Sequence, residues 1–257
     1  MAELTKRDEL EAQFAARVYK ISIKHRRELQ RLLGTPPSLR NVPEEWWKKV
    51  EQEQEDEFTP ILFLLFAASA AQHGLDFEQA NEQALEYAVA RARALAGEWV
   101  RNTKEGLRLK EGDWVVRGKP LTRHELRKEL EPVFGKNRSD KLAITETTAA
   151  QTEGGEAGIG QTLGKQETDT WFTRRDGDVC ERCEPLHGQP RSVWSEQFPS
   201  GPPAHPRCRC WIRYTSIEQD FGTIEPEIDR LRQHAQEVAK WEWPDGVDPE
   251  TWWHRRK

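Results

Sequence analysis

The segments DGDVCERCEPLHG at residues 176–188 and FPSGPPAHPRCRCWIRY at residues 198–214 contain all four cysteines of this 257-residue chain. Cys180 and Cys183 form a C-x-x-C pair, and His205, Cys208 and Cys210 follow as H-x-x-C-x-C. Free cysteine usually serves as a small buried apolar residue, so four unrelated cysteines would be scattered along a chain. Two short ligand pairs separated by a loop are instead typical of a tetrahedral zinc site.

Five candidate ligands compete for four places in this site. Each pair can present its side chains from a tight turn, and we prefer a structural zinc site built by turns 180–183 and 205–208, with three cysteines and one histidine. If the chain after Cys208 is extended, however, Cys208 and Cys210 lie on the same face. Either or both could then bind the ion, with His205 outside the ligand set. The sequence leaves this choice open.

Two other interpretations of the cysteines are weaker. A disulfide within either cysteine pair would be strained and redox-active rather than structural. A catalytic zinc needs an open position and a nearby general acid or base, but the sequence has no His-Glu-x-x-His pair, and Glu181 and Glu184 have no diagnostic spacing. His187 lies in a Leu-His-Gly turn and is expected to be a surface or packing histidine rather than a ligand. We therefore expect no enzymatic activity, with a zinc hydrolase as the weakest alternative.

The composition favours long helices and partner contacts. Only 36% of the residues are apolar, 32% are charged and the mean hydropathy is -0.87, which is little core material for one compact globule of this length. The eleven tryptophans suit interface anchors. The net charge of -5 does not favour nucleic acid overall. A zinc-ribbon-type nucleic-acid binder is nevertheless the alternative function, because arginines surround the cysteines: Arg174, Arg175, Arg182, Arg191, Arg207, Arg209 and Arg213.

Hydrophobic periodicity and capping patterns predict an α+β fold whose N-terminal region, residues 1–152, is helical and serves assembly. The first helix spans residues 3–33 and stops at Gly34-Thr35-Pro36-Pro37. The further helices expected are residues 44–57, a buried apolar helix from Pro60 to His73, a helix from the Asp76/Gln79 capping box to Arg101, a helix from the Thr122/Glu125 capping box to Phe134, and a short helix over 140–151.

The character of the sequence then changes. Five glycines between residues 154 and 164 predict a flexible hinge over 153–167. Short β-type runs at 170–173 and 210–215 belong to a small zinc-stapled β module, residues 168–216. Residues 217–257 are expected to form a C-terminal helix, 225–240, and a tail with four tryptophans that docks on the chain itself or on a neighbour.

The chain is expected to be soluble and intracellular while its particle or complex assembles. The N-terminus lacks the apolar segment of a signal peptide. The apolar run at 61–71 is too short to cross a bilayer, which takes about 20 residues. Thiols stay reduced inside cells, which favours metal ligation over disulfides.

The cysteine segments resemble the phage Mu F-like head morphogenesis family. The resemblance is carried by WFTRRDGDVCERCEPLHG at 171–188, by PPAHPRCRCWI at 202–212 and by ITETTAA at 144–150, and it covers about residues 120–215. The glycine-rich stretch 154–164 departs from the continued helix expected for the family. Residues 1–119 and 216–257 match only in general character.

The resemblance implies a minor head protein of a tailed phage or phage-like particle. It implies a structural, non-enzymatic role in head morphogenesis and in DNA packaging or delivery, with the portal protein and other head proteins as partners, possible contact with packaged DNA, and several copies in a larger assembly. The resemblance also implies that the protein is located in the virion head after assembly in the host cytoplasm. No membrane partner is expected. The family motif places the zinc ligands at Cys180, Cys183, His205, Cys208 and Cys210, and turn residues at Asp178 and Gly188.

Overall fold

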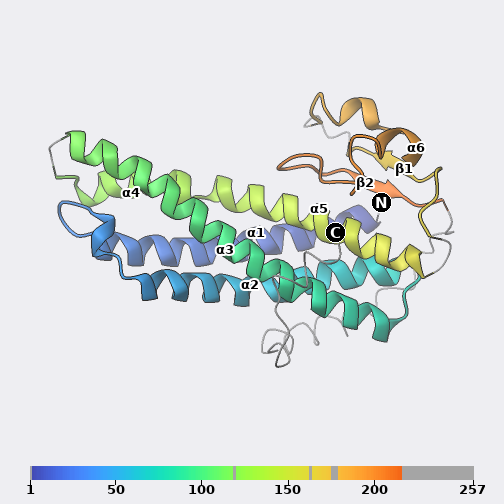
Figure 1. Ribbon diagram of the computed structural model, residues 1–257, viewed down its shortest axis with the longest axis horizontal. Helices are drawn as coiled ribbons and strands as arrows, with labels where there is room; N and C mark the ends of the chain where they lie inside the picture. The colour runs from blue at the N-terminus through green and yellow to red at the C-terminus, as the bar shows by residue number, and fades with distance from the viewer. Residues whose placement is uncertain (1, 118–119, 162–163, 175–178, 216–257) are drawn as a thin grey trace.

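The computed structural model describes residues 2–117, 120–161, 164–174 and 179–215. Five helices form an elongated bundle, and a small module follows them (Figure 1). The helices are α1 (Ala2–Leu32), α2 (Glu44–Gln72), α3 (Phe77–Arg117), α4 (Arg123–Phe134) and α5 (Lys136–Gly160). The short elements are η1 (Leu39–Asn41), β1 (Thr170–Phe172), η2 (Glu184–Leu186), α6 (Arg191–Trp194) and β2 (Trp211–Arg213). The mainly helical fold with a small β part is confirmed.

Several predicted helix boundaries hold. The first helix ends just before Gly34, and Thr122 caps α4 in the predicted capping box, with its side chain accepting from the Glu125 N–H and the Glu125 carboxylate accepting from the Thr122 N–H. At α3, the carboxylate of Asp76 accepts a hydrogen bond from the Gln79 N–H at 3.0 Å. Local capping chemistry thus places these helix starts correctly.

The prediction of two helices around Pro60 is wrong, because α2 is continuous from Glu44 to Gln72 with Pro60 inside it. A proline inside a helix costs about 3 kcal/mol. Its neighbours Phe58 and Leu62 are fully buried, and each buried apolar side chain contributes about 1.5–3 kcal/mol. Burial on both sides of the proline therefore outweighs its cost. Similarly, α3 continues to Arg117, well beyond Arg101, because Leu107 and Trp114 are buried in its last turns.

The prediction of a hinge from residue 153 is wrong as far as Gly160, where α5 ends. Gly154 and Gly158 lie one turn apart and face α2. A Cβ atom at Gly154 would lie 2.3 Å from the carbonyl oxygen of Phe66, and one at Gly158 would lie 2.6 Å from that of Ala70. Only glycine allows the two backbones to come this close, so these glycines are a packing surface. The continued helix also removes the apparent departure from the family pattern.

Two apolar clusters fill the bundle. One lies between α1, α2, α3 and α5 and includes Phe14, Phe58, Leu62 and Leu65. The second lies toward the end where α3 meets α4 and includes Leu107, Trp114 and Leu130. Among the described helices, none combines the length and apolar character needed to span a membrane.

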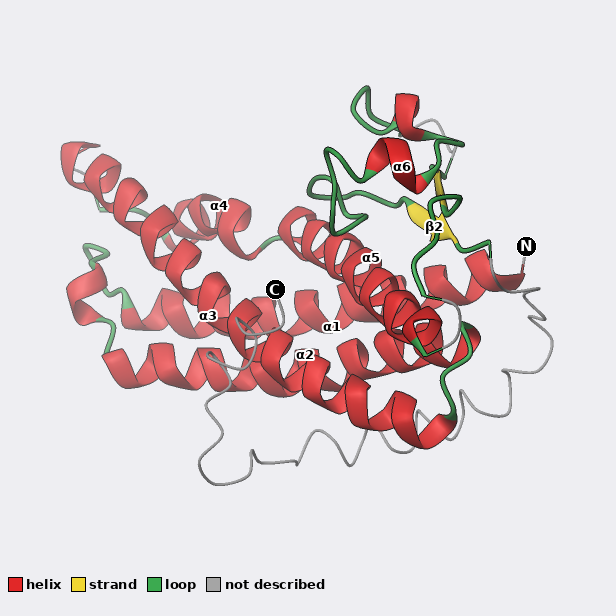
Figure 2. Cartoon of the chain, turned by 45° about the vertical axis from the view of Figure 1, so that its right-hand side comes forward, coloured by secondary structure: helices red, strands yellow, loops and turns green. Residues whose placement is uncertain are grey.

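The module lies against α5 and the N-terminal end of α1 (Figures 1 and 2). Its two predicted strands are confirmed: β1 pairs antiparallel with β2, with Trp171 opposite Ile212. A third apolar cluster forms its core, around the fully buried Trp171 and Trp194. The predicted C-terminal helix 225–240 and the tryptophan-rich tail lie outside the described residues.

Candidate metal centre

Two tight turns present the candidate ligands, as the sequence predicts. In the first turn, the N–H of Cys183 donates to the carbonyl of Cys180 at 3.0 Å. In the second, the N–H of Cys208 donates to the carbonyl of His205 at 3.1 Å. The same hydrogen-bonded closure of a four-residue turn therefore builds both turns.

The second turn is held in place by the bundle. Within it, Arg207 has φ +66°, the left-handed region, which costs a residue with a side chain about 1 kcal/mol or more. Its N–H donates to the hydroxyl of Thr145 on α5 at 2.9 Å, and its guanidinium donates to the carbonyl of Asn137 at 3.2 Å. Contacts to α5 thus stabilise the strained backbone that aims His205 and Cys208.

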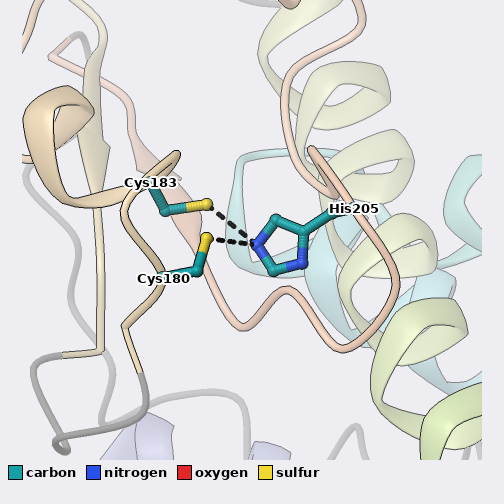
Figure 3. A group of neighbouring side chains, drawn as sticks. All are labelled: Cys180, Cys183 and His205. Atoms are coloured by element: carbon teal, nitrogen blue, oxygen red, sulfur yellow. Dashed lines mark hydrogen bonds between the residues drawn. The ribbon is translucent and has the colours of Figure 1, made fainter.

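All five candidate donors gather around the Cys183 sulfur. The Nε2 atom of His205 lies 2.9 Å from the Cys180 sulfur and 3.1 Å from the Cys183 sulfur (Figure 3). The Cys183 sulfur lies 3.9 Å from that of Cys208. Two groups of three result, Cys180–Cys183–His205 and Cys183–Cys208–Cys210, and in each group the donor atoms lie within 4.8 Å of one another. All four cysteines lie in the described part of the chain and are free of disulfides.

This donor set fits a zinc ion. Two sulfurs that share a tetrahedral zinc at about 2.3 Å lie about 3.8 Å apart, close to the Cys183–Cys208 separation. The two contacts of His205 have hydrogen-bond length, about half an ångström shorter than the separation of a nitrogen and a sulfur on one zinc ion. Metal binding would therefore need a small outward shift of the imidazole. Which four donors bind stays a prediction.

The orientation of His205 also suits a metal. Its Nδ1 atom lies 2.8 Å from the carbonyl oxygen of Pro206, which can only accept a hydrogen bond. Nδ1 therefore carries the proton and Nε2 has a free lone pair facing the sulfurs. Metal-binding histidines are commonly oriented by such a hydrogen bond from the other ring nitrogen.

The packed sulfurs perturb one another. The pKa of the Cys183 thiol is raised by its hydrogen bonds with Cys208 and Cys210 and by burial. The pKa of Cys208 is lowered, chiefly because the Cys183 thiol donates to its thiolate. A metal cation that binds to such a cluster displaces the protons that the thiols share and neutralises the charge of the thiolates.

Around the donors, buried polar groups hold the module to the bundle. The hydroxyl of Thr148 on α5 donates to the Cys208 carbonyl at 2.6 Å and accepts from the buried Arg7 of α1. Arg174 makes two hydrogen bonds with the carboxylate of Asp8, and Arg209 forms an ion pair with Glu11 at 3.3 Å. Two of the arginines beside the cysteines therefore bind α1.

Another buried group orders the module from within. The fully buried carboxylate of Asp169 accepts from Arg191 at 3.2 Å and from the N–H of Thr215 at 3.2 Å, and its carbonyl accepts from the Trp194 indole at 3.1 Å. Sequence reasoning did not single out Asp169. The only signal was its place directly before the apolar β1 run.

The remaining candidates take no part in the donor cluster. The Nδ1 atom of His187 accepts from the N–H of Thr173 at 3.1 Å, so this histidine is a packing residue, as expected. Glu181 and Glu184 are exposed, and neither group of donors in the described part of the chain contains a carboxylate. The turn residue Asp178 lies outside the described residues, whereas Gly188 has φ +78°, a turn conformation that favours glycine.

Comparison with known proteins supports the resemblance carried by these residues. Residues 113–213 match the family described as Phage Mu protein F like protein. The match begins near the end of α3 and ends with β2, so it includes α4, α5 and the five candidate ligands. No curated protein and no solved structure matches the chain.

Proposed function

We propose that this chain, whose residues 113–213 match the Phage Mu protein F like family, is a minor head protein of a tailed phage or phage-like particle. Its role is structural and non-enzymatic: it acts near the portal in head morphogenesis and in the packaging or delivery of DNA. The family match carries this proposal, because it covers the module as far as residue 213, with all five candidate ligands, together with the helix on which the module lies.

The metal centre has a structural part in this proposal. Cys180, Cys183, His205 and Cys208 would hold one zinc ion, which joins turns far apart in the sequence. The apolar core of the module is small, and modules of this size are commonly stabilised by a metal. The absence of a carboxylate from the described donor groups agrees with a structural site.

The bundle offers a surface for the portal at the end of α3. Three of the four large apolar side chains that are strongly exposed among the described residues lie there: Leu109, Val115 and Val116 are 74%, 74% and 86% exposed. The fourth, Val193, is 50% exposed and lies on the module. Exposed apolar surface on one segment is typical of protein interaction sites, and these three side chains lie between residues 109 and 116 of one helix.

Co-expression with the portal protein of the same phage-like system tests the proposal. We expect the chain to co-purify with the portal and to be present in purified heads. Val116→Glu should weaken co-purification, whereas Val193→Glu, a matched change on the module, should not. Absence of the chain from purified heads would refute the proposed function. Equal effects of the two variants would refute only the portal contact at the end of α3 and would leave the proposed function standing.

Nucleic-acid binding is a second candidate, favoured by exposed arginines on the module. Arg182 and Arg213 are exposed. We expect DNA affinity to fall as salt rises, and Arg182→Ala or Arg213→Ala to reduce the slope of log affinity against log salt by about one. The control is Arg127→Ala, an exposed arginine on α4. Equal slopes for all three variants and the native chain would reject this candidate.

A further inference from the structure

Helix α3 contains a glycine that packing within the described part of the chain does not require. Gly112 lies inside α3, where glycine is a poorer helix former than alanine. A Cβ atom at this position would meet nothing within 4 Å, whereas Gly154 and Gly158 are needed for the close approach of α2. Gly112 is exposed, and its φ is not positive. Neither internal packing nor backbone conformation therefore calls for a glycine here.

Exposed apolar side chains flank this glycine on the same face of the helix. Leu109 and Val116 are 74% and 86% exposed, and with Gly112 they have the i, i+3, i+7 spacing of one helix face. The same spacing forms the contact seam between two packed helices. We call these three residues the α3 seam. Its glycine lies between two apolar side chains and would let a second helix approach α3 closely, as Gly154 does for α2.

The neighbouring helix α4 carries exposed positive charges that the chain does not neutralise. All three of its glutamates are used internally, in the capping box with Thr122 and in ion pairs with Lys110 and Arg26. Three exposed basic side chains of α4 have no ion-pair or hydrogen-bond partner among the described residues: Arg123, Arg127 and Lys128. Arg123 is the first residue of α4, where the helix dipole disfavours a positive charge. Helix stability therefore does not account for this charge.

These charges lie next to the α3 seam. In both views of the molecule α4 runs alongside the last turns of α3 (Figures 1 and 2), and Lys110 and Glu129 join the two helices at 3.0 Å. Leu109 directly precedes Lys110, so the seam borders α4. On α3 itself the exposed Arg108 offsets the exposed Asp113. The surface beside the seam is therefore positive, although the net charge of the chain is -5.

We propose that the α3 seam binds an α-helix of the portal protein whose side facing α4 carries aspartate or glutamate. The inference rests on the proposed function, which supplies the portal as partner. The seam provides apolar contacts and a close approach at Gly112, and α4 provides charges complementary to the acidic side chains. A second copy of this chain fits less well, because a two-fold pairing of seams would bring the α4 cations of both copies to one interface.

Binding of the full-length, zinc-loaded chain to the purified portal protein of the same phage-like system, measured by surface plasmon resonance, tests the inference. Gly112→Leu should weaken binding at least about fivefold, because the added side chain occupies the point of closest approach. Its urea unfolding midpoint should not fall, because leucine is the better helix former and a Cβ there meets nothing in the chain. Gly160→Leu is the matched control on α5, where a Cβ also meets nothing within 4 Å, and it should bind as the native chain does.

Charge reversal on α4 tests the acidic character of the partner helix. Arg123→Glu should weaken binding about three- to tenfold and make it less sensitive to salt, because repulsion replaces attraction. The variant should fold, since the helix dipole favours an acidic residue in the first turn. Lys141→Glu, at an exposed lysine of α5, makes the same change in net charge and should leave binding unaltered.

The outcomes separate this inference from the proposed function. Equal portal binding by the native chain, Gly112→Leu and Arg123→Glu would overturn the inference and leave the proposed function standing. A native chain that does not bind the portal yet is present in purified heads would have the same meaning, whereas its absence from heads would refute both. Dimers of the native chain that Gly112→Leu abolishes would assign the seam to a second copy. DNA binding that Arg123→Glu weakens, without an effect on portal binding, would assign the charges to nucleic acid. Either result would overturn the portal helix.

Discussion

Cys183 is the one residue that belongs to both groups of donors, and it is 2% exposed. An ion that takes donors from both groups therefore lies next to the Cys183 sulfur. Cys208 and Cys210 are both buried beside it, so burial does not distinguish them as ligands. The two-turn set assigns Cys208 to the ion and leaves Cys210 as a buried thiol.

Serine variants decide between these ligand sets. Cys183→Ser and Cys208→Ser should lower the zinc content from about one ion per chain to nearly none, whereas Cys210→Ser should keep the ion, because a spare thiol adds no bond. Elemental analysis of the folded variants measures this. Absorption of the cobalt-substituted protein is the control, since loss of a bound thiolate weakens its sulfur-to-metal band. Loss of metal in Cys210→Ser with retention in Cys208→Ser would reverse the assignment.

The sequence predicted the donors but could not choose among them. The spacing Cys-x-x-Cys and His-x-x-Cys-x-Cys identified all five side chains that the structure brings together. The choice depends on a backbone detail, the left-handed Arg207 held by Thr145 of α5. That contact joins residues 62 positions apart, so no local pattern reveals it.

At the scale of elements, α5 packs on α2 through glycine. Gly154→Ala and Gly158→Ala should each destabilise the fold by about 1–3 kcal/mol or more, because the added methyl would overlap backbone carbonyl groups that cannot move freely. Gly160→Ala is the matched control on the same helix, since its Cβ would meet nothing within 4 Å, and it should gain about 0.5–1 kcal/mol. Urea unfolding measures all three, and a neutral Gly154→Ala would contradict the packing argument.

Helices α1 and α2 are joined by a buried histidine whose titration should affect stability. His25 is fully buried, and its Nε2 lies 2.9 Å from the Glu53 carboxylate. Burial lowers the pKa of His25 below its ordinary value of 6.5 and outweighs the opposing influence of Glu53. The unfolded chain therefore binds a proton first, so the stability that neutral His25 provides is complete above about pH 6.5 and is lost as the pH falls through the folded pKa.

His25→Gln should remove this pH dependence, because glutamine can still donate to Glu53 but does not titrate. Urea unfolding of the metal-free protein between pH 7.5 and 5.0 measures it without a contribution from metal release. The free energy of unfolding of the native chain should fall by at most about 1.4 kcal/mol per pH unit below pH 6.5, and that of the variant should fall by less. An equal loss in both proteins would assign the dependence to other groups.

Element prediction failed where tertiary packing overrides local propensity. Pro60 and the glycines of 154–160 are helix breakers in isolation, yet both lie inside long helices. The spacing Gly154-x-x-x-Gly158 did contain the answer, since residues four apart share one helix face and small residues allow helices to approach closely. The capping boxes were read correctly because their energy is local.

For the whole molecule, composition predicted an extended helical body but not how the module attaches. The module binds two helices from opposite ends of the bundle sequence, α1 through Asp8 and Glu11 and α5 through Thr148. Charged residues in the first helix gave no sign of this role, because their partners lie more than 160 positions later. Long-range ion pairs of this kind follow from the fold and do not specify it.

The division between a self-supporting bundle and a metal-dependent module predicts the response to a chelator. Removing the ion should release two turns that have little apolar core of their own, whereas the cluster that contains Phe58 and Leu62 does not depend on it. Hydrogen exchange should therefore rise strongly across residues 164–215 and stay unchanged in α2 and α3. Restoring zinc should restore protection, whereas magnesium, which prefers oxygen ligands, should not. Protection of 164–215 that survives complete metal removal would show that the contacts to α1 and α5 alone hold the module.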